Sequence, residues 1–131
     1  MSLSFGNQGS AQAQNLRDSG IPNDQILIAN RVDSYAEAAK AKGFHVEHDF
    51  AIAAGVADGE RGFLMVNLQL IQNCLVLFIL IPDQVQPRVF NEQLSPKMKS
   101  NATIVVASGY NVFFNLLKFQ PGQNVVMVAP R

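Results

Sequence analysis

A glycine-rich segment near the beginning of the chain has the residue types that bind phosphate. It reads Ser4-Phe5-Gly6-Asn7-Gln8-Gly9-Ser10 and leads into an expected helix. Gly6 would let the backbone approach a pyrophosphate, and Gly9 would let the helix pack closely on its strand. Backbone N–H groups and the positive end of the helix dipole would complete an anion site. The segment predicts a dinucleotide-binding turn, although Ser4 replaces the usual first glycine.

A second candidate, Arg31, follows the next expected strand. Domains that bind NAD usually place Asp or Glu there, where it accepts a hydrogen bond from the ribose 2′-hydroxyl. A guanidinium instead suits a 2′-phosphate, and the Ser34 hydroxyl would add a further donor. Asp33 argues for NAD, because its carboxylate would repel a phosphate. Arg31 as a solvated loop residue and Ser34 as a helix cap are the alternatives, and on balance the pattern favours NADP.

Other residues offer weaker chemistry. His45 and His48 stand among carboxylates and suggest a metal, but on a short strand they point to opposite faces. Cys74 has no evident histidine base and is better explained as a buried strand residue. The aromatic residues between Tyr110 and Phe114 could stack on a nicotinamide ring, but such residues more often belong to a core. We therefore predict no metal site and no catalytic residue.

Strand and helix patterns alternate along the whole chain. The expected strands are 1–5, 25–29, 44–46, 75–81, 103–107 and 125–128, and the expected helices are 8–19, 34–42, 49–57 and 82–94. Ser34 and Glu37 have the spacing of a capping box. This alternation predicts an α/β fold: a doubly wound, mostly parallel sheet with helices on both faces, Rossmann-like, with a truncated first strand. Residues 1–131 are expected to form a single domain.

Composition narrows the possible partners. The 131 residues are 48% hydrophobic and 15% charged, with zero formal net charge. The absence of a basic run argues against a nucleic-acid partner. The single cysteine permits no internal disulfide, which suits a reducing compartment. The 19 uncharged residues from Phe63 to Ile81 include four amides, which are costly in hydrocarbon. We expect a soluble, intracellular protein without membrane contact or a targeting segment.

Four segments share their order and approximate spacing with one enzyme family. They are Asn15-Leu16-Arg17-Asp18-Ser19-Gly20, Pro82-Asp83-Gln84-Val85-Gln86, Ser108-Gly109-Tyr110-Asn111 and Val128-Ala129-Pro130-Arg131. Together with the glycine turn, they make the chain similar to the N-terminal NADP-binding domain of ketol-acid reductoisomerase. That family is an NADPH-dependent oxidoreductase of branched-chain amino-acid biosynthesis. The resemblance covers most of the chain.

The resemblance implies a set of cofactor contacts. It places Phe5 to Gln8 on the family's pyrophosphate loop, Arg31 on its 2′-phosphate arginine, and Asp83 to Gln86 on a turn that lines the cofactor cleft. With the two residues proposed from chemistry alone, the expected cofactor residues are Phe5, Gly6, Asn7, Gln8, Gly9, Arg31, Ser34, Asp83, Gln84, Val85 and Gln86. The alternative for Asp83 is a simple helix N-cap. The implied cofactor is NADP(H).

The chain also departs from the family pattern. Ser108 stands where the family has its active-site histidine, and Arg131 stands where it has a lysine. The family's second domain, which carries the ligands for two magnesium ions, has no counterpart here, so magnesium is not expected to bind. Because alkyl migration needs those metals, we expect no catalysis by this chain alone.

Residues 59–74 form an apparent insertion of 16 residues relative to the family. The segment is interpreted as translated intron, or alternatively as a genuine surface loop. Together with the truncated first strand, it suggests a fragment that lacks its second domain. A non-catalytic protein that senses a nucleotide or mediates contacts, a product without function, and self-association through exposed edges are the other hypotheses.

Overall fold

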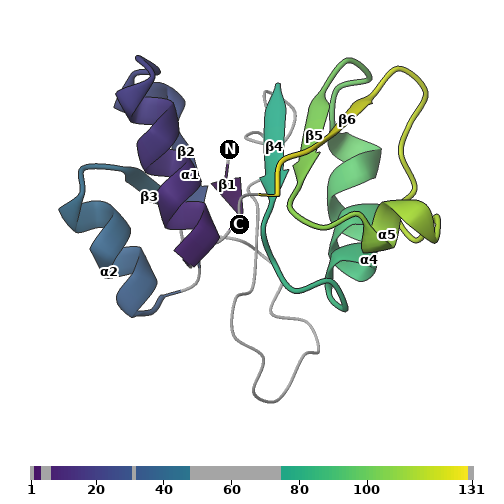
Figure 1. Ribbon diagram of the computed structural model, residues 1–131, viewed down its shortest axis with the longest axis horizontal. Helices are drawn as coiled ribbons and strands as arrows, with labels where there is room; N and C mark the ends of the chain where they lie inside the picture. The colour runs from purple at the N-terminus through teal and green to yellow at the C-terminus, as the bar shows by residue number, and fades with distance from the viewer. Residues whose placement is uncertain (1, 4–6, 31, 48–74, 130–131) are drawn as a thin grey trace. The chain divides into compact units, whose positions relative to one another are not determined.

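The computed structural model describes residues 2–3, 7–30, 32–47 and 75–129, and it shows two compact units (Figure 1). Unit 1 comprises Met1–Asn67 and unit 2 comprises Leu68–Arg131. Each unit is described by itself. The predictions that concern the helix after Asp49, His48, Cys74 and the 59–74 segment lie outside the described residues.

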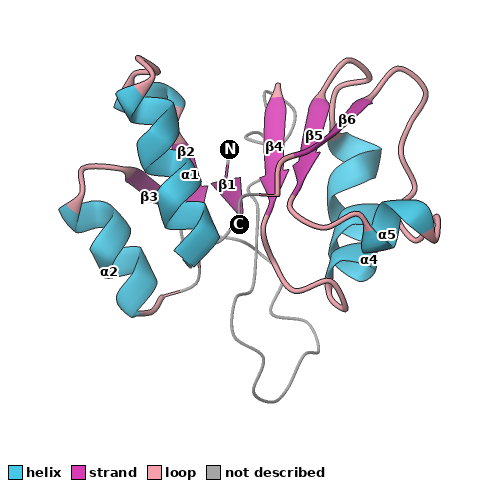
Figure 2. Ribbon diagram, viewed as in Figure 1, coloured by secondary structure: helices cyan, strands magenta, loops and turns pink. Residues whose placement is uncertain are grey.

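Unit 1 is a three-stranded parallel sheet with two helices (Figure 2). Its elements are β1 (Ser2–Leu3), α1 (Asn7–Asp18), a short 3₁₀ turn η1 (Asn23–Gln25), β2 (Leu27–Ala29), α2 (Ser34–Ala41) and β3 (His45–Glu47). Strand β2 is central: Ile28 is paired with Ser2 on one side and with Val46 on the other. The strand–helix–strand order explains the parallel pairing, because each helix returns the chain to the same end of the sheet.

The core of unit 1 combines large strand residues with small helical ones. Ile26, Ile28 and Phe44 pack with Ala13 from α1 and Ala39 from α2. The two alanines are fully buried, as small residues are where a helix lies close to a sheet. Both helices end at a glycine with positive φ, Gly20 at 98° and Gly43 at 81°. These are the left-handed conformations that end helices and that glycine adopts without strain.

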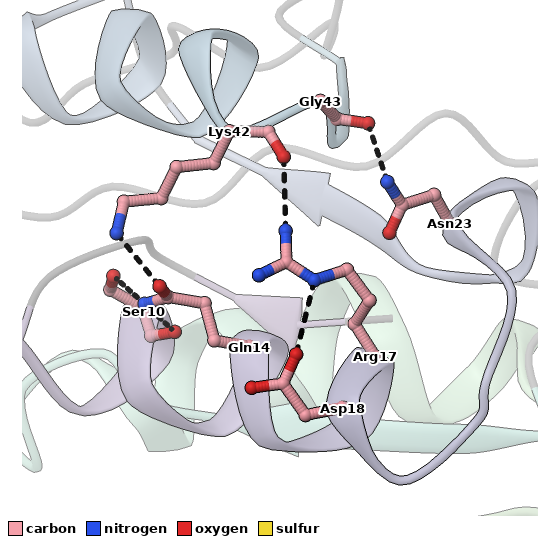
Figure 3. Close-up of polar contacts among 7 residues, drawn as sticks. All are labelled: Ser10, Gln14, Arg17, Asp18, Asn23, Lys42 and Gly43. Carbon is pink, nitrogen blue, oxygen red and sulfur yellow. Dashed lines mark hydrogen bonds and ion pairs between the residues drawn. The ribbon is translucent and has the colours of Figure 1, made fainter.

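Arg17 links the two helices of unit 1 (Figure 3). Its Nη1 donates a hydrogen bond of 3.1 Å to the Lys42 carbonyl just beyond the end of α2. Its guanidinium also lies 5.2 Å from the centre of the Phe44 ring. The Lys42 ammonium donates in return to Oε1 of Gln14, at 2.8 Å. A cation at this position satisfies a carbonyl that the helix itself leaves without a partner.

Unit 2 contains three parallel strands with helical connections. Its elements are β4 (Val76–Ile79), α4 (Gln86–Val89), a π-helical turn η2 (Phe90–Leu94), a 3₁₀ turn η3 (Ser95–Lys97), β5 (Thr103–Val106), α5 (Tyr110–Phe113) and β6 (Asn124–Met127). Strand β5 is central between β4 and β6. The largest fully buried side chains of this unit are Leu77, Ile79, Val89, Phe90, Leu94, Ile104 and Val106.

The prediction of an α/β fold with parallel strands is confirmed, and three local predictions are wrong. The helix expected from Pro82 begins only at Gln86, after a turn over residues 83–85. Asp83 is therefore not its N-cap. The capping box at Ser34 is also wrong, because Asp33 is the N-cap of α2 and accepts from the backbone of Tyr35 and Ala36. The expected strands 25–29 and 75–81 shorten to β2 and β4.

Within the described part of the chain, no helix is long and apolar enough to cross a membrane.

Candidate functional site

Two turns at the carboxyl ends of β4 and β5 are joined by polar side chains. The first turn contains Asp83 and runs into Gln86 at the start of α4, and the second contains Ser108 and runs into Asn111 in α5. The Asn111 amide donates to Oε1 of Gln86 at 2.9 Å and to the Asp83 carbonyl at 2.8 Å. Ser108 Oγ donates to Oδ2 of Asp83 at 3.0 Å. Carboxyl ends of parallel strands are where doubly wound sheets bind ligands, so these turns form a candidate site.

Gln86 completes the connections within the first turn. Its Nε2 donates to the Ile81 carbonyl at 2.8 Å and to Oδ1 of Asp83 at 3.1 Å. Gln86 and Asn111 are only 3% and 1% exposed, so these amides are almost fully withdrawn from water. Buried amides are tolerated when they are hydrogen-bonded, and each Nδ2 or Nε2 here makes two bonds. We call these four residues, Asp83, Gln86, Ser108 and Asn111, the turn network.

A pocket of about 330 Å³ opens between the same two turns. It is lined by Asp83, Gln84, Pro87, Tyr110, Asn111 and Leu116. Its volume is at the lower end of the range for small-molecule sites. The predicted residues of the first turn therefore divide in two: Asp83 and Gln84 line the pocket, whereas Val85 and Gln86 are buried.

The second half of the glycine-rich segment forms the first turn of α1. This helix begins at Asn7 and has no acidic residue in its first turn. Gln8 is exposed and Gly9 is buried. The N-terminus of a helix without carboxylates attracts anions, which fits the predicted pyrophosphate turn. Phe5, Gly6 and Arg31 lie outside the described residues, and Asn7 is described only as the helix start.

The end of β2 is organised by a carboxylate. Oδ1 of Asp33 accepts hydrogen bonds from Tyr35 N at 2.9 Å, from Ala36 N at 3.1 Å and from Nδ2 of the buried Asn30 at 2.8 Å. Ser34, predicted as a cofactor residue, is exposed in the first turn of α2. A negative charge is thus fixed where a dinucleotide-binding fold places the adenosine ribose.

The remaining candidates lie elsewhere. His45 is exposed, and no cluster of metal-ligating side chains occurs among the described residues. The interpretation of Tyr110, Phe113 and Phe114 as core residues is wrong, since they are 56%, 78% and 54% exposed. Phe114 lies 4.8 Å from Tyr110 and 5.0 Å from Phe113 between ring centres. Asn111 is not among the residues predicted for the site, although it closes the segment after β5 that resembles a family motif.

Comparisons with known proteins identify the family of the chain. The family model described as "Acetohydroxy acid isomeroreductase, NADPH-binding domain" matches residues 2–131. A ketol-acid reductoisomerase (NADP(+)) from Pyrobaculum arsenaticum is 38% identical over 129 residues, which are 98% of this chain and 33% of that protein. One from Methanobrevibacter smithii is 32% identical over 130 residues, again 98% of this chain and 33% of that protein.

A solved structure supports the same assignment. The structure of an NADH-preferring ketol-acid reductoisomerase from an uncultured archean matches with a TM-score of 0.73 and 27% identity. The match covers 99% of this chain and 35% of that one. The chain thus spans about a third of the length of the relatives that it matches. By sequence and by fold, it belongs to the NADPH-binding domain family of acetohydroxy acid isomeroreductase, the ketol-acid reductoisomerases.

Proposed function

We propose that this chain is an NADP(H)-binding domain that provides the cofactor half of a ketol-acid reductoisomerase. The observation that carries the proposal is the start of α1 at Asn7, within the glycine-rich segment and without a carboxylate in its first turn. Such a helix start binds a pyrophosphate through backbone N–H groups, and it requires no cationic side chain. The family match over residues 2–131 supports the same cofactor.

The proposal assigns one portion of the dinucleotide to each unit. Doubly wound dinucleotide-binding folds consist of two mononucleotide-binding halves, and each unit has the three parallel strands of one such half. Unit 1 would take the adenosine 2′-phosphate portion near the end of β2, with Arg31 and Ser34 as donors. Unit 2 would take the nicotinamide portion at the pocket lined by Asp83 and Gln84. A bound NADPH would supply the hydride.

We further propose that the chain does not catalyse the isomerisation alone. The position of the family's active-site histidine is held by Ser108, whose hydroxyl, unlike an imidazole, does not ionise near neutral pH. That hydroxyl instead donates to the Asp83 carboxylate. In this proposal the chain binds and orients the cofactor, and it needs further protein to carry out chemistry.

NADH is the second candidate cofactor, and Asp33 is the observation that favours it. Among the described residues, three donors hold its Oδ1 at the start of α2, so the carboxylate cannot easily turn away from a 2′-phosphate. The structural relative with a TM-score of 0.73 is an enzyme that prefers NADH. Discrimination between the two cofactors then depends on the balance between the Arg31 cation and the Asp33 anion.

Calorimetric titration of the folded chain with NADPH and then NADH tests both candidates. We expect saturable binding of NADPH that weakens in Arg31→Ala, because a guanidinium–phosphate pair is lost. Tighter binding of NADH, with no effect of Arg31→Ala, would favour the second candidate. A folded chain that binds neither nucleotide would refute the proposal.

A further inference from the structure

The turn network has a property that a direct ligand-binding site would not have. Its buried donors are already used: Nδ2 of Asn111 makes two hydrogen bonds, and Nε2 of Gln86 makes two more. An amide nitrogen carries two hydrogens, so neither group has a donor left for a ligand. The resemblance that predicted Gln86 as a cofactor contact therefore needs another physical explanation in this chain.

The network and the pocket share the same two walls. One wall is the turn with Asp83, Gln84 and Pro87, and the opposite wall includes Tyr110 and Asn111. The bonds from Asn111 cross from one wall to the other, to the Asp83 carbonyl and to the Gln86 side chain. Ser108 adds a third crossing, to the Asp83 carboxylate. The separation of the walls is thus set by three short hydrogen bonds, two of which are made by a buried amide.

We propose that Asn111, Gln86 and Ser108 are positioning residues, which fix the distance between the two turns and so set the pocket for one portion of the cofactor. They act through Asp83 and Gln84, the residues that face the pocket from the first turn. This inference rests on the proposed function, because it concerns how that site binds its nucleotide. A fully connected buried network holds one geometry, whereas a partly connected one has several arrangements of similar energy.

Ser108 has a specific part in this arrangement. Its Oγ donates to Oδ2 of Asp83 and accepts from the backbone N–H of Tyr110, at 3.3 Å. With Gln86 on Oδ1, both oxygens of the Asp83 carboxylate are held. The serine at this position thus orients a carboxylate at the pocket, which is a different use of the position from proton transfer.

The test compares two probes that report on different units. NADPH contains both mononucleotide portions, whereas adenosine 2′,5′-bisphosphate contains only the portion assigned to unit 1. We expect Asn111→Ala to raise the Kd for NADPH about tenfold, because two buried acceptors lose their donor and the walls are no longer held. We expect the Kd for adenosine 2′,5′-bisphosphate to change less than about twofold. Both are measured by calorimetry on the full chain, with the folded fraction checked by circular dichroism.

Ser108 variants keep the test decisive if Asn111→Ala does not fold. Ser108 is only partly buried, so Ser108→Ala should fold, and it should raise the Kd for NADPH about threefold. Ser108→Thr retains the hydroxyl and should restore the wild-type Kd. Gln120→Ala is the matched control: the Gln120 amide donates to the Ser95 carbonyl in the same unit, and Gln120 does not line the pocket.

The outcomes separate the inference from the proposed function. If the Asn111 or Ser108 variant weakens the binding of both probes equally, the network has only a structural role and the inference is overturned. The inference is also overturned if the Kd for NADPH does not change, or if Gln120→Ala changes it by the same amount. If the wild-type chain binds neither probe, the proposed function itself fails.

Discussion

Replacing Asp33 by alanine removes a side chain that stabilises the start of α2 and carries a negative charge beyond the end of β2, where we propose that the 2′-phosphate binds. Its Oδ1 accepts from two backbone N–H groups of the first helical turn, at 2.9 and 3.1 Å, and from the buried Asn30 amide at 2.8 Å. Asp33→Asn keeps a side-chain oxygen that can accept the same backbone bonds, and removes only the charge. The two variants therefore separate capping from electrostatics.

The structure sets the expected magnitudes. Loss of an N-cap costs about 1 kcal/mol, and loss of the charge-assisted bond to Asn30 adds about 1 kcal/mol, so Asp33→Ala should lose about 2 kcal/mol of unfolding free energy. Asp33→Asn should lose about 1 kcal/mol, since the backbone bonds can be kept while the charge that strengthens the bond to Asn30 and interacts with the helix dipole disappears. Removal of one charge repelling a phosphate should improve NADPH binding about fivefold relative to NADH.

Urea unfolding, followed by circular dichroism, measures the first effect, and calorimetric titration with both nucleotides measures the second. Asp24→Asn is the control, because Asp24 is an exposed carboxylate of the same unit. The reasoning is refuted if Asp33→Ala and Asp33→Asn unfold at the same urea concentration as the wild type. The electrostatic part fails separately if Asp33→Asn leaves the ratio of the two Kd values unchanged.

Three further predictions concern packing. Gly122→Ala should destabilise by about 2 kcal/mol or more in urea unfolding, because φ is +91° and the added Cβ would lie 2.8 Å from a backbone oxygen; Gly20→Ala, with similar φ but open space, should cost about 1 kcal/mol. Phe90→Ala should cost about 3–5 kcal/mol in the same assay because the ring is fully buried, whereas the exposed Phe113→Ala should change stability little; similar losses would contradict the described core. Arg17→Ala should lower the free energy of unfolding by about 1 kcal/mol, through its bond to a helix-end carbonyl and its contact with an aromatic ring, and an unchanged urea midpoint would show that these contacts add nothing.

The parallel α/β pattern was predictable because its signals are local. The apolar run that contains Leu77 and Ile79 marks a buried strand, and both residues are in the core. Gly20 and Gly43 mark helix ends because few other residues adopt the positive φ found there. In both cases the residues that determine the local structure lie within a few positions of one another, so a sequence pattern is sufficient to predict it.

Other features could not be predicted, because they depend on two residues that compete for one role or on contacts between residues distant in the sequence. Asp33 and Ser34 are adjacent and both are good N-caps, so the sequence could not decide which side chain turns toward the helix. Similarly, a π-helical turn at Phe90–Leu94 depends on how that segment packs, and propensity contains no signal for it. Asn111 entered the site only through bonds to residues 25 and 28 positions earlier, which no local pattern predicts.

The saturated amides also constrain how this chain can change over generations of mutation. At the exposed Gln84, a single substitution would leave no described hydrogen bond unmatched. Gln86 and Asn111 are different, since a change in either leaves the other with an unmatched buried group. A lineage can leave that pairing only through two coordinated substitutions, with a less fit intermediate between them. We therefore expect these two positions to vary together or not at all.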